Sequence, residues 1–416
     1  MEAGRTRLSR QRFHLDLRED GTYTSSWQKE TLACKGNSVW KAEIKFKDGS
    51  GNNEITLTVS TGQPSSTKEQ SLCWECPQML SNIDQERRPK LSASLLKSAV
   101  QKNVRLCRSS PAVRASLHLM KDSWSEFLRR ATIIALEDAI LHPDLPFLVW
   151  LTAAVAKGYQ PSKLHAAVCL RIVHEMAAVK CRDPLSDADE ADTHCPTMSD
   201  ISQHVSAQEA TVLKALLLRA SCGGMAGDVR MLRCYVRVWL KRFSGASPPP
   251  PPLANFCSGP ADVTSPSSDV SLDWGNWLRR LYAQTPRPPQ VLDTCTSGAL
   301  PAVVDVAAMS RIMLSDVPPS AADFHCSNVI EDVLKDTPAG RQVEATCREE
   351  AVDAKAVFRS AMWHFRSSKN LKKTLDGETS TDTEDGSQAA RIWSALSAEA
   401  QKYSLNLIKR RFGVWT

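Results

Sequence analysis

Long apolar runs are missing from this sequence of 416 residues. One of the longest, residues 148–156, is far shorter than the roughly 20 residues that a membrane-spanning helix needs. The first 13 residues are basic and contain no apolar stretch of the kind found in a secretory signal peptide. We therefore expect neither a membrane segment nor a secretion signal.

The short motifs of nucleotide binding and hydrolysis are also missing. A P-loop requires Gly-x4-Gly-Lys-Ser/Thr, so that backbone N–H groups and a lysine hold the phosphates, and the sequence contains none. His-Glu-x-x-His and Gly-x-Ser-x-Gly are absent too. The one glycine cluster, residues 223–227, precedes Asp228, whose charge would repel phosphate, and we interpret it as a link between helices. We expect no cofactor and assign no catalytic residue.

The cysteines lack the density of a disulfide framework. There are 13, an odd number scattered along a long chain, so we expect reduced thiols in the nucleus or cytoplasm. Cys73 and Cys76 have the spacing of half a zinc site, and a second close pair is missing. We expect no metal. The alternative is a zinc site that Cys34, Cys107 and His118 complete.

Nucleophile and base residue types occur together at residues 323–327, in the order Asp-Phe-His-Cys-Ser. Neighbours in sequence do not meet side chain to side chain, as a catalytic pair must, so we interpret this segment as the start of a helix. An enzyme whose site is assembled from scattered residues stays open as an alternative. Its candidate residues are His174, Glu175, Asp323 and His325.

The period of the apolar residues changes near residue 91. Residues 12–60 alternate with period two between turn signals, which predicts an antiparallel sheet of three or four strands. From residue 91 on the period is helical. The predicted fold is mainly α with a small N-terminal antiparallel β-sheet (α+β), a multi-helix array. Helices are predicted at 91–108, 111–121, 123–141, 145–157, 162–180, 207–221, 228–243, 273–284, 304–315, 320–335, 346–373 and 388–411.

Composition divides the chain into five parts. A Pro-rich stretch, 244–271, has five consecutive prolines and is typical of a linker. An acidic segment, 374–387, is expected to be disordered. The predicted parts are a sheet at 1–62, a basic helical domain at 78–181, a helical pair at 206–243, the linker at 244–271 and a helical region at 272–416.

Positive charge is concentrated in two places, although the net charge is only +6. Residues 87–130 contain eleven basic and two acidic residues, a net charge of +9. A second group recurs at i, i+3, i+7 and i+11 on one helical face, residues 230–241. Such stripes pair with phosphate or carboxylate groups, unless they are only the solvated face of a packed helix. The candidate contact residues are Lys97, Lys102, Arg105, Arg129, Arg130, Arg230, Arg233, Arg237 and Lys241.

A capped helix that begins near Ser123 carries an unusual acid. Asp138 shares a face with Ile134 and Leu141, so we expect it to be partly buried. A buried carboxylate needs a partner, such as an arginine from another element. We interpret Glu137 and Asp138 as a structural pair rather than as a general acid and base.

The same region resembles a known family. A helix with the order Ser-Ala-x-x-Leu-Lys-Ser at 92–98 precedes Arg-Arg at 129–130 and Glu-Asp at 137–138. Residues 91–160 thereby resemble the C-terminal, clamp-loader-like helical domain of the replication-associated recombination AAA+ ATPases, also called the Werner-helicase-interacting family. The family's ATPase module would lie upstream, where this chain has about 90 residues of β-like pattern. The resemblance implies oligomerisation or binding to a replication or repair complex, without ATP hydrolysis.

These observations favour a non-catalytic helical adaptor or oligomerisation protein, associated with DNA replication or repair. Its expected partner is another protein or a second copy of the chain, and no membrane is expected. Direct binding of nucleic acid by the basic stripes is the first alternative, and the enzyme with an assembled site is the second.

Overall fold

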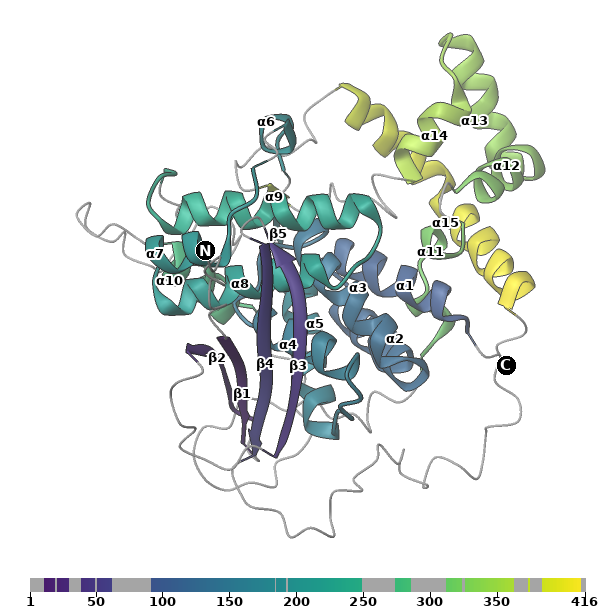
Figure 1. Cartoon of the computed structure of the whole chain (residues 1–416). Helices are drawn as coiled ribbons and strands as arrows, with labels where there is room; N and C mark the ends of the chain where they lie inside the picture. The colour runs from purple at the N-terminus through teal and green to yellow at the C-terminus, as the bar shows by residue number, and fades with distance from the viewer. Residues whose placement is uncertain are drawn as a thin grey trace, which may run out of the picture.

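The computed structural model describes residues 11–18, 21–29, 39–48, 51–61, 91–183, 185–191, 194–248, 274–285, 312–323, 326–362, 373–374 and 384–412. In these residues a small sheet lies against a larger set of helices, and a second group of helices projects to one side (Figure 1). The predicted mainly α fold with a small sheet is confirmed. Cys34, Cys73, Cys76 and most of the Pro-rich and acidic segments lie outside the described residues.

The sheet has four strands in the order β2-β1-β4-β3. The bounds are Gln11–Leu17 for β1, Tyr23–Lys29 for β2, Trp40–Asp48 for β3 and Gly51–Thr61 for β4. The β1–β2 and β3–β4 pairs are antiparallel, but β1 and β4 are parallel. The predicted antiparallel sheet is therefore wrong at its centre. Alternation predicts which side chains are buried, and it leaves the direction of the neighbouring strand open.

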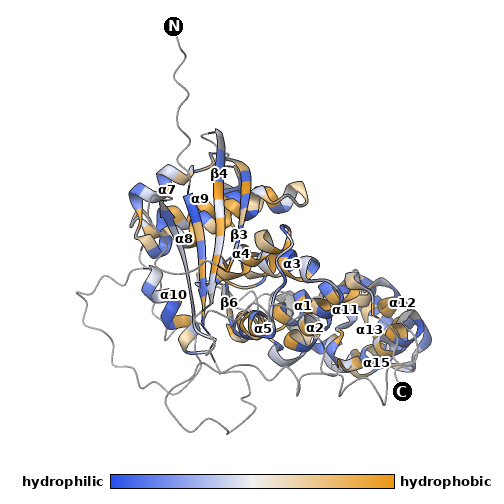
Figure 2. Ribbon diagram, turned by 60° about the horizontal axis from the view of Figure 1, so that its bottom comes forward, coloured by the Kyte–Doolittle hydropathy of each residue, from blue (hydrophilic) through white to orange (hydrophobic). Residues whose placement is uncertain are grey.

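The parallel pair is the apolar centre of the sheet. Its register places Phe13 beside Leu57 and Leu15 beside Val59, and all four side chains are buried. The strands alternate in hydropathy in Figure 2, as expected for a sheet with one face in the core. The indole N–H of Trp150 donates to the carbonyl oxygen of Phe13 at 3.1 Å. The sheet therefore shares its core with the helices.

The helices that follow the sheet have caps and apolar faces that explain their limits. Ser92 and Ser123 accept hydrogen bonds from backbone N–H groups of the first turns of α1 and α3. α4 is buried along nearly its whole length. The bounds are Ala93–Arg105 for α1, Ser109–Asp122 for α2, Trp124–Glu137 for α3, Leu145–Val155 for α4 and Lys163–Ala178 for α5.

The next elements complete the main core. No helix was predicted between residues 180 and 207. α7 nevertheless forms there, and a capping box of Thr197 and Asp200 stabilises its first turn. α8 packs against α4, α9 and the sheet. The bounds are Cys181–Arg182 for β5, Asp187–Ala191 for α6, Met198–His204 for α7, Ala207–Ser221 for α8, Ala226–Phe243 for α9 and Trp274–Ala283 for α10.

The C-terminal helices enclose a second apolar cluster, around Val329, Phe358 and Leu396. They are the helices that project at the upper right of Figure 1. The bounds are Leu314–Asp316 for the 3-10 helix η4, Pro319–Ala322 for α11, Ser327–Asp336 for α12, Pro338–Glu349 for α13, Ala354–Met362 for α14, Lys373–Thr374 for β6 and Glu384–Phe412 for α15.

Three predictions for this region need correction. The predicted helix 346–373 is interrupted, because Ala351 adopts φ +57° and ends α13 before α14 begins. The predicted helix 320–335 is two helices, α11 and α12. α15 begins at Glu384, inside the segment 374–387 that was expected to be disordered. Of the predicted helix 304–315, residues 304–311 lie outside the described residues.

A short segment joins the two groups of helices. Asp316 of η4 is 1% exposed and accepts two hydrogen bonds from Arg114 of α2, at 2.8 and 2.6 Å. Its carbonyl oxygen accepts a third from Asn103 of α1 at 2.6 Å. The C-terminal helices are therefore held to α1 and α2 by polar contacts as well as by packing. Nowhere in the described part does a helix have the length and apolar character needed to cross a membrane.

Candidate functional site

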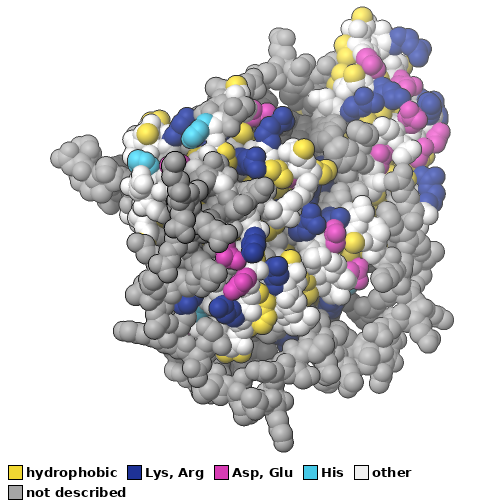
Figure 3. All heavy atoms as spheres, viewed as in Figure 1, with side chains coloured by type: hydrophobic (Ala, Val, Ile, Leu, Met, Phe, Trp, Pro, Cys, Tyr) yellow, Lys and Arg dark blue, Asp and Glu magenta, His cyan; other side chains and the backbone are white. Residues whose placement is uncertain are grey.

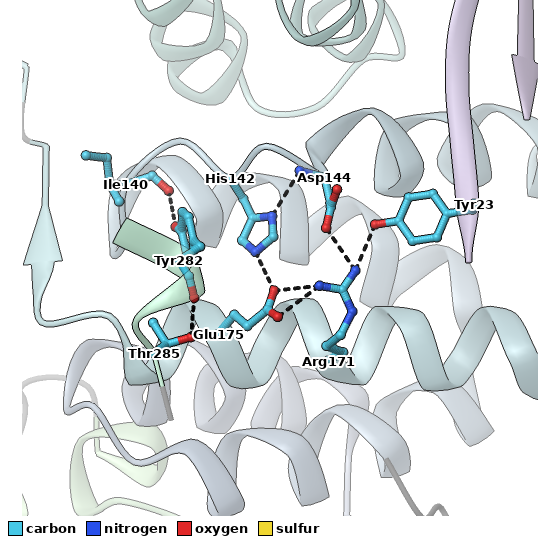
Figure 4. A network of polar contacts seen from close by, with 8 residues as sticks. All are labelled: Tyr23, Ile140, His142, Asp144, Arg171, Glu175, Tyr282 and Thr285. Atoms are coloured by element: carbon cyan, nitrogen blue, oxygen red, sulfur yellow. Dashed lines mark hydrogen bonds and ion pairs between the residues drawn. The ribbon is translucent and has the colours of Figure 1, made fainter. Parts of the chain in front are cut away.

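A cavity of about 430 Å³ lies where the sheet, α5, α8 and α10 meet. Its volume falls within the range of small-molecule pockets. β2 supplies Tyr23, the connection between α3 and α4 supplies His142 and Asp144, and α5 supplies Arg171 and Glu175. Figure 4 shows these side chains pointing toward one another from separate elements.

Arg171 is the centre of a hydrogen-bonded network. Its Nη1 donates to both carboxylate oxygens of Glu175 at 2.9 Å, one helical turn away. Its Nη2 donates to Asp144 Oδ2 at 2.8 Å and to the Tyr23 hydroxyl at 2.9 Å. One guanidinium thus connects α5, the α3–α4 connection and β2.

His142 makes a hydrogen bond at each of its ring nitrogens. Nδ1 lies 3.0 Å from the backbone nitrogen of Asp144, and Nε2 lies 3.0 Å from Glu175 Oε2. The imidazole ring stacks on Tyr282, with ring centroids 4.2 Å apart, and the Tyr282 hydroxyl donates to the Ile140 carbonyl at 2.7 Å.

The two carboxyl groups of the network have depressed pKa values. Burial by itself would raise the pKa of Glu175, but the hydrogen bond and the charge of His142, followed by the charge of Arg171, outweigh it. Burial likewise opposes ionisation of Asp144, and His142, Arg171 and Tyr23 together hold its pKa below the usual value. Both acids are therefore ionised at neutral pH.

His142, Asp144 and Glu175 bring their ligand-type atoms within 4.8 Å of one another, which raises the question of a metal ion. A metal would require a lone pair on His142 Nε2, which is already hydrogen-bonded to Glu175 Oε2. Arg171 also occupies both carboxylates. The triad therefore fits a structural network better than a metal site.

Five of the nine candidate contact residues are committed to internal interactions. Lys102, Arg105 and Arg237 are 1%, 9% and 4% exposed, so their charges do not reach a partner. Lys97 is paired with Glu126 at 2.5 Å, and Arg130 donates to Gln101. Arg237, a member of the predicted stripe on α9, is buried because residues 189 and 194 cross that helix. The carbonyl oxygens of these two residues accept hydrogen bonds from the Arg237 guanidinium.

The other four candidate residues are exposed: Arg129, Arg230, Arg233 and Lys241. Arg129 belongs to α3, and the other three belong to α9. The buried Arg219 connects the two helices, since it donates to the Arg129 carbonyl and to the carbonyl of Gly223, just before α9. We call these four residues the α9 cationic face. Several dark-blue side chains lie in the band of Figure 3 that α9 occupies in Figure 1.

The expectation for Asp138 is confirmed. Its side chain is fully buried, and Arg105 of α1 donates to it at 2.5 Å. Gln101 adds a hydrogen bond at 2.8 Å. Glu137 lies at the surface side of the same group, 3.6 Å from Arg105. Lys102 is nearby, and burial, followed by the charge of Arg105, lowers its pKa to about 8, although Asp138 opposes this.

The scattered candidate residues for an enzyme do not gather in one pocket. Glu175 lines the cavity, whereas the other described members, His174 and Asp323, are absent from its lining. Asp323 accepts a hydrogen bond from the backbone N–H of Asn328, which supports the interpretation of this segment as a helix start. His325 lies outside the described residues. The eight cysteines among the described residues form no disulfide.

Sequence reasoning missed the network around Arg171. His142-Pro143 suggested only the end of a helix, and the i,i+4 pair of Arg171 and Glu175 is common on solvated helix faces. Tyr23 lies 148 residues before Arg171. No local pattern connects residues so far apart.

Comparisons with known proteins identify no relative. No family model, no curated protein and no solved structure matches this chain.

Proposed function

We propose that this chain is a non-catalytic helical adaptor that binds an acidic partner through the α9 cationic face. The observation that supports this most is the division among the candidate cations. The fold uses five of them internally, and it leaves Arg129, Arg230 and Arg233 exposed without an ion pair to any described acid. Keeping unpaired charge on one face is typical of a surface that steers an oppositely charged partner.

The geometry of α9 suits a surface of this kind. Arg230 and Arg233 are one turn apart, and Lys241 follows at a distance of roughly 12 Å along the helix from Arg233, given a rise of 1.5 Å per residue. The apolar side of the helix, with Leu232, Val236 and Trp239, is buried in the core. The helix is thereby fixed, and little backbone entropy is lost when its outer face binds.

The resemblance of residues 91–160 to a helical oligomerisation domain supports a role in assembly. In such a role the exposed positions of α1 to α3 form the rigid surface, and a missing nucleotide-binding motif is no obstacle. We place the adaptor, as part of this proposal, among protein complexes of DNA replication or repair.

A charge-reversal variant tests the proposal. The triple variant Arg129→Glu, Arg230→Glu and Arg233→Glu should weaken binding of a fluorescein-labelled polyglutamate peptide at least about tenfold, because attraction becomes repulsion. The measurement is fluorescence anisotropy at an ionic strength of about 0.1 M, where the Debye length is about 10 Å. The matched control reverses three exposed lysines elsewhere, Lys41, Lys157 and Lys180, and so changes the net charge equally.

The control should stay within about twofold of the unmodified chain, since long-range charge alone is screened beyond a Debye length. Equal losses in both variants would mean that only the net charge matters. Unchanged binding in the first variant would contradict the proposal.

Direct binding of nucleic acid is the second candidate, because Arg230, Arg233 and Lys241 are exposed on one 18-residue helix. It predicts that affinity for a mixed-sequence duplex or RNA falls steeply as salt rises, since each phosphate contact releases counterions. Dissociation constants weaker than about 100 μM at low salt for both nucleic acids would rule out this candidate, because non-specific binding is ordinarily tighter.

A further inference from the structure

The segment that joins the C-terminal helices to the main core is bound in the manner of a peptide ligand. Asp316 is 1% exposed, and Arg114 of α2 donates to both of its carboxylate oxygens, at 2.8 and 2.6 Å. Asn103 of α1 donates to the backbone carbonyl oxygen of Asp316 at 2.6 Å. Arg108, just before α2, donates to the backbone carbonyl oxygen of Ser315 at 2.6 Å. The surface of α1 and α2 thus recognises one carboxylate and two backbone carbonyls.

Apolar side chains anchor the segment on both sides of this carboxylate. Val317 is 2% exposed and belongs to the apolar cluster of the main core, and Ile312 and Leu314 pack against that cluster. The segment also orients its own acid, because the backbone N–H of Met313 donates to Asp316 Oδ2 at 2.7 Å. Recognition of an acidic motif by arginines is a recurring mode of peptide binding.

The internal segment fills this surface imperfectly. The C-terminal helices enclose an apolar cluster of their own, whereas the segment packs in the cluster of the main core. α11, which continues the segment, packs against α1 (Figure 1). Asn103 Oδ1 of α1 and Ser320 Oγ of α11 are buried, and neither has a hydrogen-bond partner in the described part of the chain. Buried polar atoms without partners cost free energy, so a ligand that satisfied Asn103 would bind this surface better.

We propose that residues 312–317 are an internal ligand, which occupies a docking site on α1 and α2 for an acidic segment of a partner protein. The partner segment carries a carboxylate for Arg114 and apolar residues on both sides of it, as the internal segment does. Arg108 and Arg114 give the site its positive charge, and this is why its occupant is acidic. Binding of the partner displaces residues 312–317 and releases the C-terminal helices from α1 and α2. The docking site is separate from the α9 cationic face.

The internal segment itself provides the probe, a fluorescein-labelled peptide with the sequence of residues 312–322. Its binding to the full chain is measured by fluorescence anisotropy. A tethered segment has an effective concentration on the order of 1 mM at its site, so the unmodified chain should bind the peptide weakly. Asp316→Asn in the chain weakens the internal contact alone and should raise the affinity for the unmodified peptide at least about tenfold, because a larger fraction of the sites is open.

Asp332→Asn is the matched control. Asp332 is also an acid of the C-terminal helices, and it is paired with Arg410 rather than with α2. This variant loses the same charge as Asp316→Asn and leaves the internal contact intact. Its affinity for the peptide should equal that of the unmodified chain.

Two further changes locate the peptide on the proposed site, and both are measured with the Asp316→Asn chain. A peptide that carries asparagine in place of Asp316 should bind at least about tenfold more weakly than the unmodified peptide, because the carboxylate for Arg114 is lost. Adding Arg114→Met to the chain should weaken binding of the unmodified peptide to a similar extent, because the other half of the ion pair is then missing.

A second opening variant keeps the test valid if Asp316→Asn destabilises the chain. Leu314→Ala removes a half-buried apolar anchor of the internal segment and leaves every ion pair in place. It should raise the affinity for the peptide at least about threefold. Met313→Ala is its control, since the side chain of Met313 is 51% exposed, and this variant should bind as the unmodified chain does.

Three results would overturn the proposal. The first is that neither Asp316→Asn nor Leu314→Ala binds the peptide more tightly than its control variant. The second is that the asparagine peptide binds as tightly as the unmodified peptide. The third is that Arg114→Met leaves the affinity unchanged.

Discussion

Replacing Asp138 by asparagine is expected to lower the free energy of unfolding by about 3–5 kcal/mol, because it leaves buried cations without their counter-charge. Asp138 is fully buried, and the side chain of Arg105 is 10% exposed. Lys102, 1% exposed, adds a second positive charge to the same region. An amide keeps the shape of the carboxylate and removes only its charge, so packing changes do not confuse the result.

Urea unfolding followed by circular dichroism measures this effect. Glu137→Gln is the matched control, because the two acids are adjacent and differ mainly in burial. The side chain of Glu137 is 41% exposed, and its loss should cost less than about 1 kcal/mol. Similar losses for the two variants would contradict the assignment of Asp138 as the buried structural acid.

Replacing Arg171 by methionine is expected to cost about 2–4 kcal/mol, somewhat less than for a fully buried pair because the side chains are partly exposed. The variant leaves Asp144 and Glu175 facing each other without a cation. It also removes the contact between α5 and the Tyr23 hydroxyl of β2. The control is Arg391→Met, since Arg391 is exposed and makes an ion pair with Glu350 at the surface.

The same variant should change how stability depends on pH. The pKa values of Asp144 and Glu175 are depressed in the folded protein, so the folded state binds fewer protons than the unfolded chain. Their contribution is present above their unfolded pKa values, about 4, and is lost as the pH falls through the lower folded values. In Arg171→Met this loss on acidification should be smaller. An unchanged acid dependence would show that Arg171 is not what holds these carboxyls ionised.

The fold was predictable where the local pattern decides it. The change from period two to helical period near residue 91 separates the sheet from α1. The pairing of β1 with β4 was not predictable, because alternation gives the same buried side chains for either strand direction. The break at Ala351 was not predictable either. Residues 346–362 have a continuous helical pattern, and packing of α14 against α12 and α15 requires the turn.

The sites show the same limit. The burial of Asp138 follows from its position on the face of Ile134 and Leu141, and its partner lies 33 residues earlier in the chain. Arg237 belongs to the basic stripe by spacing, yet residues 189 and 194 cover it. Periodicity identifies a face of a helix. It does not identify what packs against that face, and this is why three of the nine cations proved to be buried.

The most direct test of the α9 cationic face compares two arginines one turn apart on the same helix. Arg233 is exposed, whereas Arg237 is 4% exposed and donates to the His194 carbonyl at 2.7 Å. The measurement is the dissociation constant for the polyglutamate peptide, determined for Arg233→Gln and Arg237→Gln at a temperature where both are folded. We expect Arg233→Gln to weaken binding by about threefold or more without loss of stability, and Arg237→Gln to lose stability while binding normally. Normal binding by Arg233→Gln, or an equal loss of affinity in the folded Arg237→Gln variant, would contradict the assignment of this face as the partner-binding surface.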